Sequence, residues 1–225
     1  KLDDEHGDLV KLKVLPSMYP QGAEKTIIKS CTGREVPPGK LPSDVGVVVM
    51  NITSIAYLER FLEDGRPLLS KRITVDGGAI KNPCNVKVPI GTYIKDVAEF
   101  CGGFTEEPAE IIYGGPMMGM SVNNLNAPIL KQNNGILFLT EKEAQDAAPG
   151  DCIKCARCVD ACPMGLAPVL MDQNINHGKI EELDALNIMS CMECGSCSFV
   201  CPAKRKLIQS IRTSKSMLRA KKEAK

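Results

Sequence analysis

The chain has 225 residues, of which 44% are hydrophobic, and its 28 Lys and Arg against 27 Asp and Glu give a formal net charge of +1. A chain of this length can build one large domain or two small ones with apolar cores. Because the charges cancel, the composition favours neither a nucleic-acid-binding protein nor a protein for strongly acidic substrates.

Neither a membrane span nor a signal peptide is predicted. The most apolar run, which starts at Val45, is shorter than the roughly 20 residues that a transmembrane helix needs and contains polar residues. The opening KLDDEHGD is charged and has no apolar stretch. Because the chain does not begin with Met, we expect it to be a fragment or a trimmed product of a longer protein.

The first 69 residues have the pattern of an α/β domain. A strand is predicted from Leu9, a short helix over 22–33 and a Pro- and Gly-rich loop over 34–44. A buried strand over 45–51 and an amphipathic helix from Ile52 to Gly65 follow. A strand that meets a helix at 51–54 is typical of a nucleotide-binding α/β domain, although no Gly-rich phosphate loop accompanies it.

Residues 70–140 have a different pattern. Hydrophobic residues alternate over 72–76 and 86–89, with a hairpin-type turn at 76–78. A helix over 93–103 and a strand over 109–113 follow, and GILFL adds one more strand at 135–139. This order predicts a small β-grasp-like domain with a return strand. The polar stretch 141–151 is predicted to be a linker.

Two stretches after the linker are almost copies of each other: CIKCARCVDACP from Cys152 and CMECGSCSFVCP from Cys191. Both follow C-x2-C-x2-C-x3-C-P and together contain eight of the eleven cysteines. An odd number of cysteines argues against a complete disulfide framework, and the tight spacing favours metal ligation in a reducing compartment. The three scattered cysteines, Cys31, Cys84 and Cys101, are predicted to be small buried hydrophobic residues.

This spacing is typical of proteins with two [4Fe–4S] clusters, in which the fourth cysteine of each motif binds the other cluster. One predicted ligand set is therefore Cys152, Cys155, Cys158 and Cys201. The second is Cys191, Cys194, Cys197 and Cys162. The alternative is a pair of four-cysteine zinc sites, which the ligand type alone would allow.

The region 152–225 is predicted to be an all-helical two-cluster ferredoxin domain, because the spacer between the motifs is long and helical. The end of the chain is a basic helix with nine Lys or Arg and one Glu from Lys204 onward. Lys154, Arg157 and Lys204 lie next to the motifs, where they would raise the local redox potential and favour an acidic redox partner. No nucleophile–base pair is evident, so we assign no catalytic side chain.

The order of the motifs resembles the C subunit of Rnf-type electron-transport complexes. The stretches that carry the resemblance are TGREVPPGKLPSDVGVVVMN, VDGGAIKNPCNVKVPIGT, GGPMMG and both cysteine motifs. The resemblance implies the C-terminal part of a flavin- and NADH-binding α/β domain over 1–69, similar to the flavin-binding subunit of respiratory complex I. It further implies an SLBB β-grasp domain over 70–140 and a two-cluster ferredoxin domain over 152–225.

The same resemblance implies positions for an FMN site. YPQGAE places Tyr19, Gly22 and Glu24 where the larger family has a Y-x-x-G-x-E segment, and VMNITS offers Asn51 and Ser54. Met50 and Thr53 depart from the family pattern, and its Gly-rich phosphate loop is absent from these residues. The chain is therefore expected to hold at most half of a flavin site.

The implied function is electron transfer between NADH-reduced flavin and ferredoxin or membrane subunits, coupled to Na+ or H+ translocation. The implied location is the cytoplasmic face of the bacterial membrane, in contact with the other subunits of the complex. Two alternatives remain open at this point. One is a cobalamin reductase with the same order of domains, and the other is a binding module in which metals only stabilise the fold.

Overall fold

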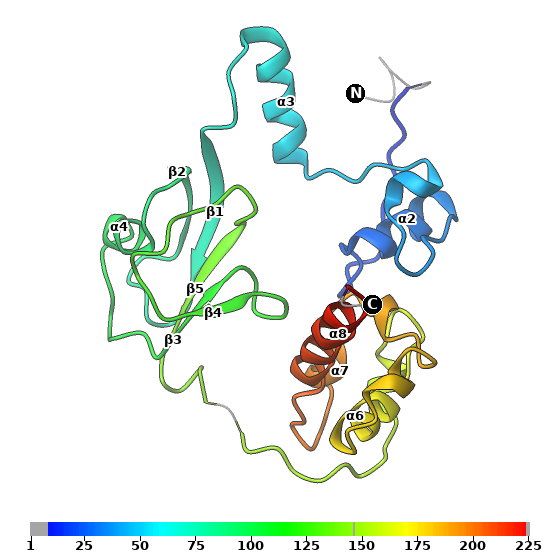
Figure 1. Ribbon diagram of the computed structural model, residues 1–225. Helices are drawn as coiled ribbons and strands as arrows, with labels where there is room; N and C mark the ends of the chain where they lie inside the picture. The colour runs from blue at the N-terminus through cyan, green and yellow to red at the C-terminus, as the bar shows by residue number, and fades with distance from the viewer. Residues whose placement is uncertain (1–8, 146, 224–225) are drawn as a thin grey trace. The chain divides into compact units, whose positions relative to one another are not determined.

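The computed structural model describes residues 9–145 and 147–223 (Figure 1). Their contacts divide the chain into two compact units. The cysteine unit combines Lys1–Val49 with Pro149–Lys225, and the sheet unit is Met50–Ala148. No described helix is long and apolar enough to cross a membrane.

The sheet unit contains a five-stranded mixed sheet. Its elements are α3 (Ile52–Asp64), β1 (Ser70–Asp76), β2 (Cys84–Pro89), α4 (Ile94–Phe100), β3 (Glu110–Tyr113), β4 (Met120–Val122) and β5 (Gly135–Leu139). The strand order is β2-β1-β5-β3-β4. β1 and β5 are parallel, with Val75 beside Ile136, and the other pairs are antiparallel. The predicted mixed α/β character is confirmed, and β4 is a short strand that the sequence did not predict.

Period-two alternation puts the core of this unit on one face of the sheet. Ile73 and Val75 of β1 are buried, while Thr74 between them is exposed. Ile94 and Val97 of α4 also belong to this core. Phe138 of β5 is fully buried and packs on Phe104, and the two ring centroids lie 5.2 Å apart.

Helix α3 forms as predicted, but its apolar side chains remain exposed. The Asn51 side chain accepts a hydrogen bond from the backbone N–H of Thr53 and so caps the helix, which ends at Gly65 in the left-handed region. Leu58 and Phe61, which lie on the apolar face of this helix, are 45% and 51% exposed. No residue of this helix is buried among the described parts of the chain.

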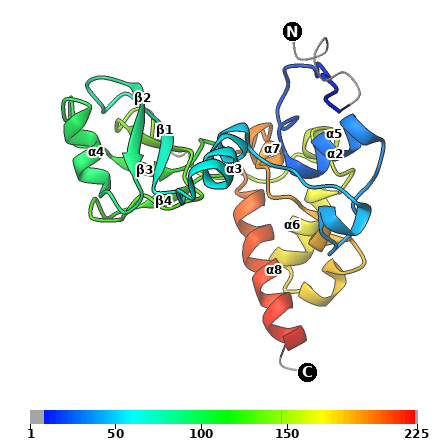
Figure 2. The same ribbon diagram turned by 90° about the horizontal axis from the view of Figure 1, so that it is seen from above.

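The cysteine unit is helical. Its elements are α2 (Glu24–Thr32), the 3-10 helix η1 (Pro42–Val45), α5 (Arg157–Asp160), α6 (Pro168–Asn176), η2 (Ile180–Leu183), η3 (Ile188–Ser190), α7 (Ser196–Phe199) and α8 (Leu207–Glu223). Helices α6 and α8 lie side by side (Figures 1 and 2). The buried side chains of Met171, Leu183, Ile188 and Ile211 form a core between them and the 3-10 helices. The prediction of a helical region after Cys152 is confirmed.

Two strand predictions in the first 51 residues are wrong. The segment from Leu9 and the segment 45–51 contain no strand in the described part of the chain. Leu12 and Val14 are more than 80% exposed. A strand is stable only when neighbouring strands pair with its backbone, and the described residues of this unit provide none.

Candidate metal centres

The two cysteine motifs have the same backbone path. Lys154 and Glu193 occupy the third position of their motifs, and both have φ near +60°. Ala156 and Gly195 occupy the fifth position, and both are also in the left-handed region. The third cysteine of each motif then lies on a short helix, α5 or α7. The sequence repeat is therefore also a repeat of loop geometry, in a first cysteine loop (152–158) and a second cysteine loop (191–197).

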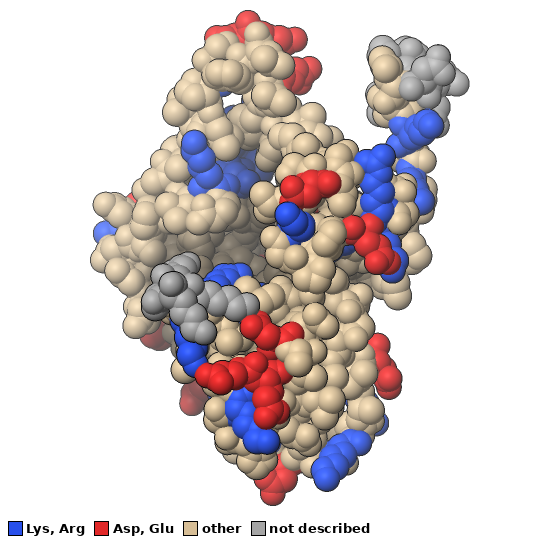
Figure 3. Space-filling model, turned by 45° about the vertical axis from the view of Figure 1, so that its right-hand side comes forward, with Lys and Arg blue, Asp and Glu red and all other residues tan. Residues whose placement is uncertain are grey.

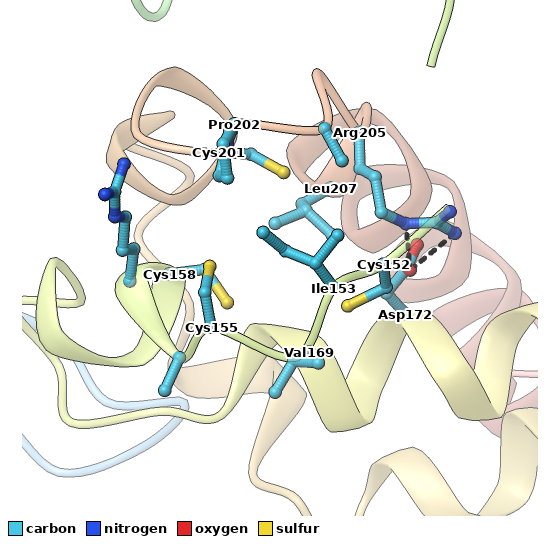
Figure 4. A pocket seen from close by; sticks show the side chains of 13 residues that line it. Cys152, Ile153, Cys155, Cys158, Val169, Asp172, Cys201, Pro202, Arg205 and Leu207 are labelled. Atoms are coloured by element: carbon cyan, nitrogen blue, oxygen red, sulfur yellow. Dashed lines mark hydrogen bonds and ion pairs between the residues drawn. The ribbon is translucent and has the colours of Figure 1, made fainter. Parts of the chain in front are cut away.

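The first cysteine loop borders a small cavity, here called the first cavity. The cysteines that line it are Cys152, Cys155, Cys158 and Cys201. Figure 4 shows the sulfur atoms of Cys152 and Cys201 directed toward the space between these residues. Cys201, the last cysteine of the second motif, thus lies with the first three cysteines of the first motif.

The second cysteine loop borders a second small cavity, here called the second cavity. Its cysteines are Cys162, Cys191, Cys194 and Cys197. The fold therefore brings together the same two groups of four that the ferredoxin spacing predicts, with the fourth cysteine of each motif exchanged. Their role as ligands stays a prediction. In the described parts of the chain, no three His, Cys, Asp or Glu side chains form a site for a single metal ion.

The donor sets fit iron–sulfur clusters in their chemistry, because four cysteine thiolates are the ligands that a [4Fe–4S] cluster takes. The thiols of the second cavity are more buried, and burial raises the pKa of Cys197 to about 12. Burial also raises the pKa of Cys191 and of Cys158. These thiols are therefore protonated when free at neutral pH, and metal binding must release their protons.

Backbone N–H groups already point at two of the sulfur atoms. The N–H of Leu166 donates to Cys162 Sγ and the N–H of Glu193 donates to Cys191 Sγ, both at 3.4 Å. Such bonds stabilise negative charge on the ligand sulfur and tune the potential of a bound cluster. Sequence spacing gives no signal for them.

An ion pair adjoins the first cavity. Arg205 Nη2 lies 2.7 Å from Asp172 Oδ2, and the pair is drawn with dashed lines in Figure 4. Arg205 also donates to the carbonyl oxygen of Gly150 at 3.2 Å. The pair therefore connects α6, the chain after Cys201 and the segment that enters the first cysteine loop. No sequence pattern indicates this ion pair, because Arg205 is one of many basic residues at this end of the chain.

A second ion-pair group adjoins the second cysteine loop. Glu193 accepts hydrogen bonds from Lys215 and Arg212 of α8. These two pairs and that of Arg205 show that part of the positive charge predicted for the end of the chain is neutralised inside the fold. On the face shown in Figure 3, Lys and Arg are interspersed with Asp and Glu.

The basic residues predicted to attract an acidic partner are exposed. Lys154 and Arg157 of the first cysteine loop and Lys204 after the second motif all lie on the surface. The first cysteine loop is itself largely exposed, including Cys155, whereas Cys194 to Cys197 are buried. The first cavity is accordingly the one nearer to solvent.

The residues predicted to contact flavin are divided between the two units. Tyr19, Gly22 and Glu24 belong to the cysteine unit, and Asn51 and Ser54 to the sheet unit. The Tyr19 hydroxyl donates to the carbonyl oxygen of Cys194, in the second cysteine loop. Glu24 is the exposed first residue of α2, after the exposed Gly22.

Asn51 serves as the cap of α3, and Ser54 lies half-buried in its first turn. The polar atoms of Asn51 that a cofactor could use are thus partly engaged by the helix. The assignment of all five residues to a flavin site stays a prediction.

The three cysteines outside the motifs differ in exposure. Cys101 is buried, as predicted, but the prediction of burial is wrong for Cys31 and Cys84, which are exposed. Cys31 lies near the end of a helix that buries only Ile28, and Cys84 begins the edge strand β2. Residue type alone does not reveal whether another element covers a position.

Three family models match the chain. They are a Nuo51 FMN-binding domain over residues 2–60, an SLBB domain over 72–121 and a 4Fe-4S dicluster domain over 151–205. The dicluster match contains both cysteine loops, and the SLBB match covers β1 to β4 in part. Together with the paired cysteine cavities, these matches define an iron–sulfur protein that carries an SLBB domain.

Several curated proteins are similar to the chain over most of its length. The C subunit of the proton-translocating ferredoxin:NAD(+) oxidoreductase complex of Clostridium ljungdahlii is 48% identical over 95% of the chain and 47% of its own length. The C subunit of the ion-translocating oxidoreductase complex of Rhodobacter capsulatus is 41% identical over 94% of the chain and 41% of its own length. The C subunit of the Na(+)-translocating ferredoxin:NAD(+) oxidoreductase complex of Acetobacterium woodii is 44% identical over 89% of the chain and 45% of its own length.

The chain belongs to the family formed by the C subunits of ion-translocating (Rnf-type) oxidoreductase complexes. It spans about half the length of the curated relatives that it matches. The recognition made from the motif order is thereby confirmed.

Proposed function

We propose that the chain is the cluster-bearing half of an electron-transfer subunit that exchanges electrons with flavin on one side and with ferredoxin or membrane subunits on the other. The observation that carries the proposal is the pair of four-cysteine cavities with exchanged fourth cysteines. The similarity to subunits named for ferredoxin:NAD(+) oxidoreductase complexes supports the reaction type.

Each bound [4Fe–4S] cluster would supply one-electron transfer. The chain contributes the ligands, the burial and the hydrogen bonds. Cys162 at one cavity and Cys201 at the other tie the two motifs together, so the two clusters would lie close to each other. The buried Cys194 and Cys197 limit access of water to the second site. The exposed first cysteine loop suits exchange of electrons with an acidic protein partner.

The proposal includes FMN and NADH in the longer protein, with Tyr19, Gly22, Glu24, Asn51 and Ser54 as partial flavin contacts. It also places the protein at the cytoplasmic face of the bacterial membrane, with Na+ or H+ translocation by the other subunits. The FMN-binding family match over 2–60 supports the flavin. The names of the relatives support NAD and ion translocation.

The number of clusters and their exchanged ligands can be tested with double variants. Purified anaerobically, the protein should contain about eight iron atoms, and Cys155→Ser or Cys201→Ser should each leave about four. Because these two cysteines belong to one proposed set, the double variant should still keep about four. The matched double variant Cys155→Ser with Cys162→Ser removes a ligand from each set and should keep almost none.

If each motif binds its own cluster, the iron contents of the two double variants will be reversed. Cys155→Ser with Cys201→Ser would then keep almost no iron, and Cys155→Ser with Cys162→Ser would keep about four atoms. Colourless protein with zinc in place of iron would overturn the redox function altogether.

The electron donor is tested separately, with the full-length protein loaded with FMN. Anaerobic addition of NADH should bleach the cluster absorbance; bleaching by dithionite but not by NADH would contradict NADH as the donor.

A further inference from the structure

The two cysteine loops share a backbone conformation but differ in what holds them. At the third position of the first loop, Lys154 is exposed. At the same position of the second loop, Glu193 is half-buried, with its side chain 30% exposed, and faces α8. The second loop is thus attached to the long helix by a contact that has no equivalent at position 154 among the described interactions.

The attachment is made by a buried lysine. The Lys215 side chain is only 6% exposed, and its Nζ lies 2.6 Å from Glu193 Oε1. The same Nζ donates to the carbonyl oxygen of Cys191 at 2.9 Å. Arg212, one turn earlier on α8, donates from Nε to Glu193 Oε2 at 3.1 Å.

A buried ammonium group is costly unless it is paired and hydrogen-bonded, and Lys215 meets both conditions. Lys215 lies next to the second cavity and not next to the first. Cys191 lines that cavity, and the neighbouring Ile211 of α8 lines it as well. The ammonium charge is therefore held next to the first cysteine of the set and shielded from solvent, where electrostatic effects are larger than in water.

We propose that Lys215 is a positioning residue of the second cluster site. It orients the second cysteine loop through the Cys191 carbonyl and Glu193, and its charge stabilises the electron that this site accepts. The inference rests on the proposed function, because it assumes that the two sets of four cysteines hold separate clusters. Its consequence is an asymmetry: the cluster at the second cavity depends on Lys215, and the one at the first cavity does not.

The test separates the two clusters by working in single-cluster backgrounds. Cys155→Ser leaves only the cluster of the second cavity, and Cys194→Ser leaves only that of the first. In the Cys155→Ser background, Lys215→Met should lower the equilibrium constant for reduction of the remaining cluster at least tenfold. For one electron this is a fall in the midpoint potential of about 59 mV. In the Cys194→Ser background the same change should have no such effect. The readout is an anaerobic redox titration followed by electron paramagnetic resonance.

Arg219→Met is the matched control, because Arg219 is an exposed cation on the same helix. It removes the same charge and should leave both potentials unchanged. If Lys215→Met prevents loading of the remaining cluster, Lys215→Gln and Lys215→Arg replace it. Lys215→Arg keeps the charge and should restore most of the potential, whereas Lys215→Gln should not.

Three results would decide against the inference. One is an unchanged potential in the Cys155→Ser background. Another is an equal shift in both backgrounds, and the third is a shift of the same size in Arg219→Met. A failure of the proposed function looks different, since the protein without substitutions would then not contain about eight iron atoms.

Discussion

The hydroxyl oxygen of Tyr19 lies 2.5 Å from the carbonyl oxygen of Cys194, across 175 positions of the chain. Desolvation of the phenol raises the pKa of Tyr19, and the electrostatic effect of the nearby Cys194 raises it further. The hydroxyl therefore keeps its proton and acts as a donor at neutral pH. The segment before α2 is thereby attached to the second cysteine loop. Tyr19, which the family resemblance predicts to contact flavin, is thus bonded to the backbone of a predicted cluster ligand.

Tyr19→Phe should lower the free energy of unfolding of the cysteine unit by about 1 kcal/mol, the usual net value of one hydrogen bond. Urea unfolding of the iron-loaded protein, followed by loss of cluster absorbance, measures the change. Tyr93→Phe is the control, because Tyr93 lies in the sheet unit. Equal urea midpoints for Tyr19→Phe and the parent protein would contradict this prediction. They would mean that water takes over the hydrogen bond of the phenol hydroxyl without loss of stability.

Gly77 is required for the turn after β1. Its φ is +110°, and an added Cβ would lie 2.1 Å from the carbonyl oxygen of Phe138. Gly77→Ala should therefore destabilise the sheet unit by about 2–5 kcal/mol, from backbone strain and overpacking together. At Gly91, where φ is +97°, an added Cβ would meet no neighbouring atom within 4 Å. Substitution by Ala there therefore adds only backbone strain. Gly91→Ala should cost about 1–2 kcal/mol, and thermal unfolding of both variants would compare them; similar losses would contradict the steric argument.

Glu143 makes the sheet unit sensitive to acid. Backbone N–H groups of Thr140 and Gly78 donate to its carboxylate and lower its pKa below the ordinary 4.5. A carboxyl with a lowered pKa in the folded state adds stability that is present above its ordinary pKa and is lost as the pH falls through the folded pKa. Glu143→Gln should therefore flatten the dependence of unfolding midpoint on pH below about 4.5. An identical acid limb in the variant and the parent would contradict this assignment.

The thiol of Cys101 should react slowly. Burial and then the hydrogen bond with Cys84 raise its pKa to about 11, and the two sulfur atoms lie 3.7 Å apart. Because the thiolate is the nucleophile, alkylation by iodoacetamide at pH 8 should be at least about tenfold slower at Cys101 than at the exposed Cys31. Peptide mass spectrometry with time gives both rates in one sample. Comparable rates in folded protein would show that Cys101 is accessible.

The sequence alone determined the features that depend on local pattern. Alternating hydrophobic residues located β1 and β2, and Asn51 with Gly65 marked the ends of α3. The cysteine spacing predicted which four cysteines lie together, because C-x2-C-x2-C is short enough for one loop to place three sulfur atoms around one cavity. Motif order was sufficient to recognise the family.

Tertiary structure decided what depends on neighbours distant in the chain. The segment at Leu9 has the residues of a strand but no described strand to pair with. The sequence pattern does not indicate the contacts of Lys215 with Glu193 or of Arg205 with Asp172, because both cations belong to a segment with many basic residues. Only the folded structure shows which cation is buried next to which carboxylate. A repeated motif therefore specifies two similar loops, and the surrounding helices make their environments different, since the charge and solvent around a thiolate come from elements far away in the sequence.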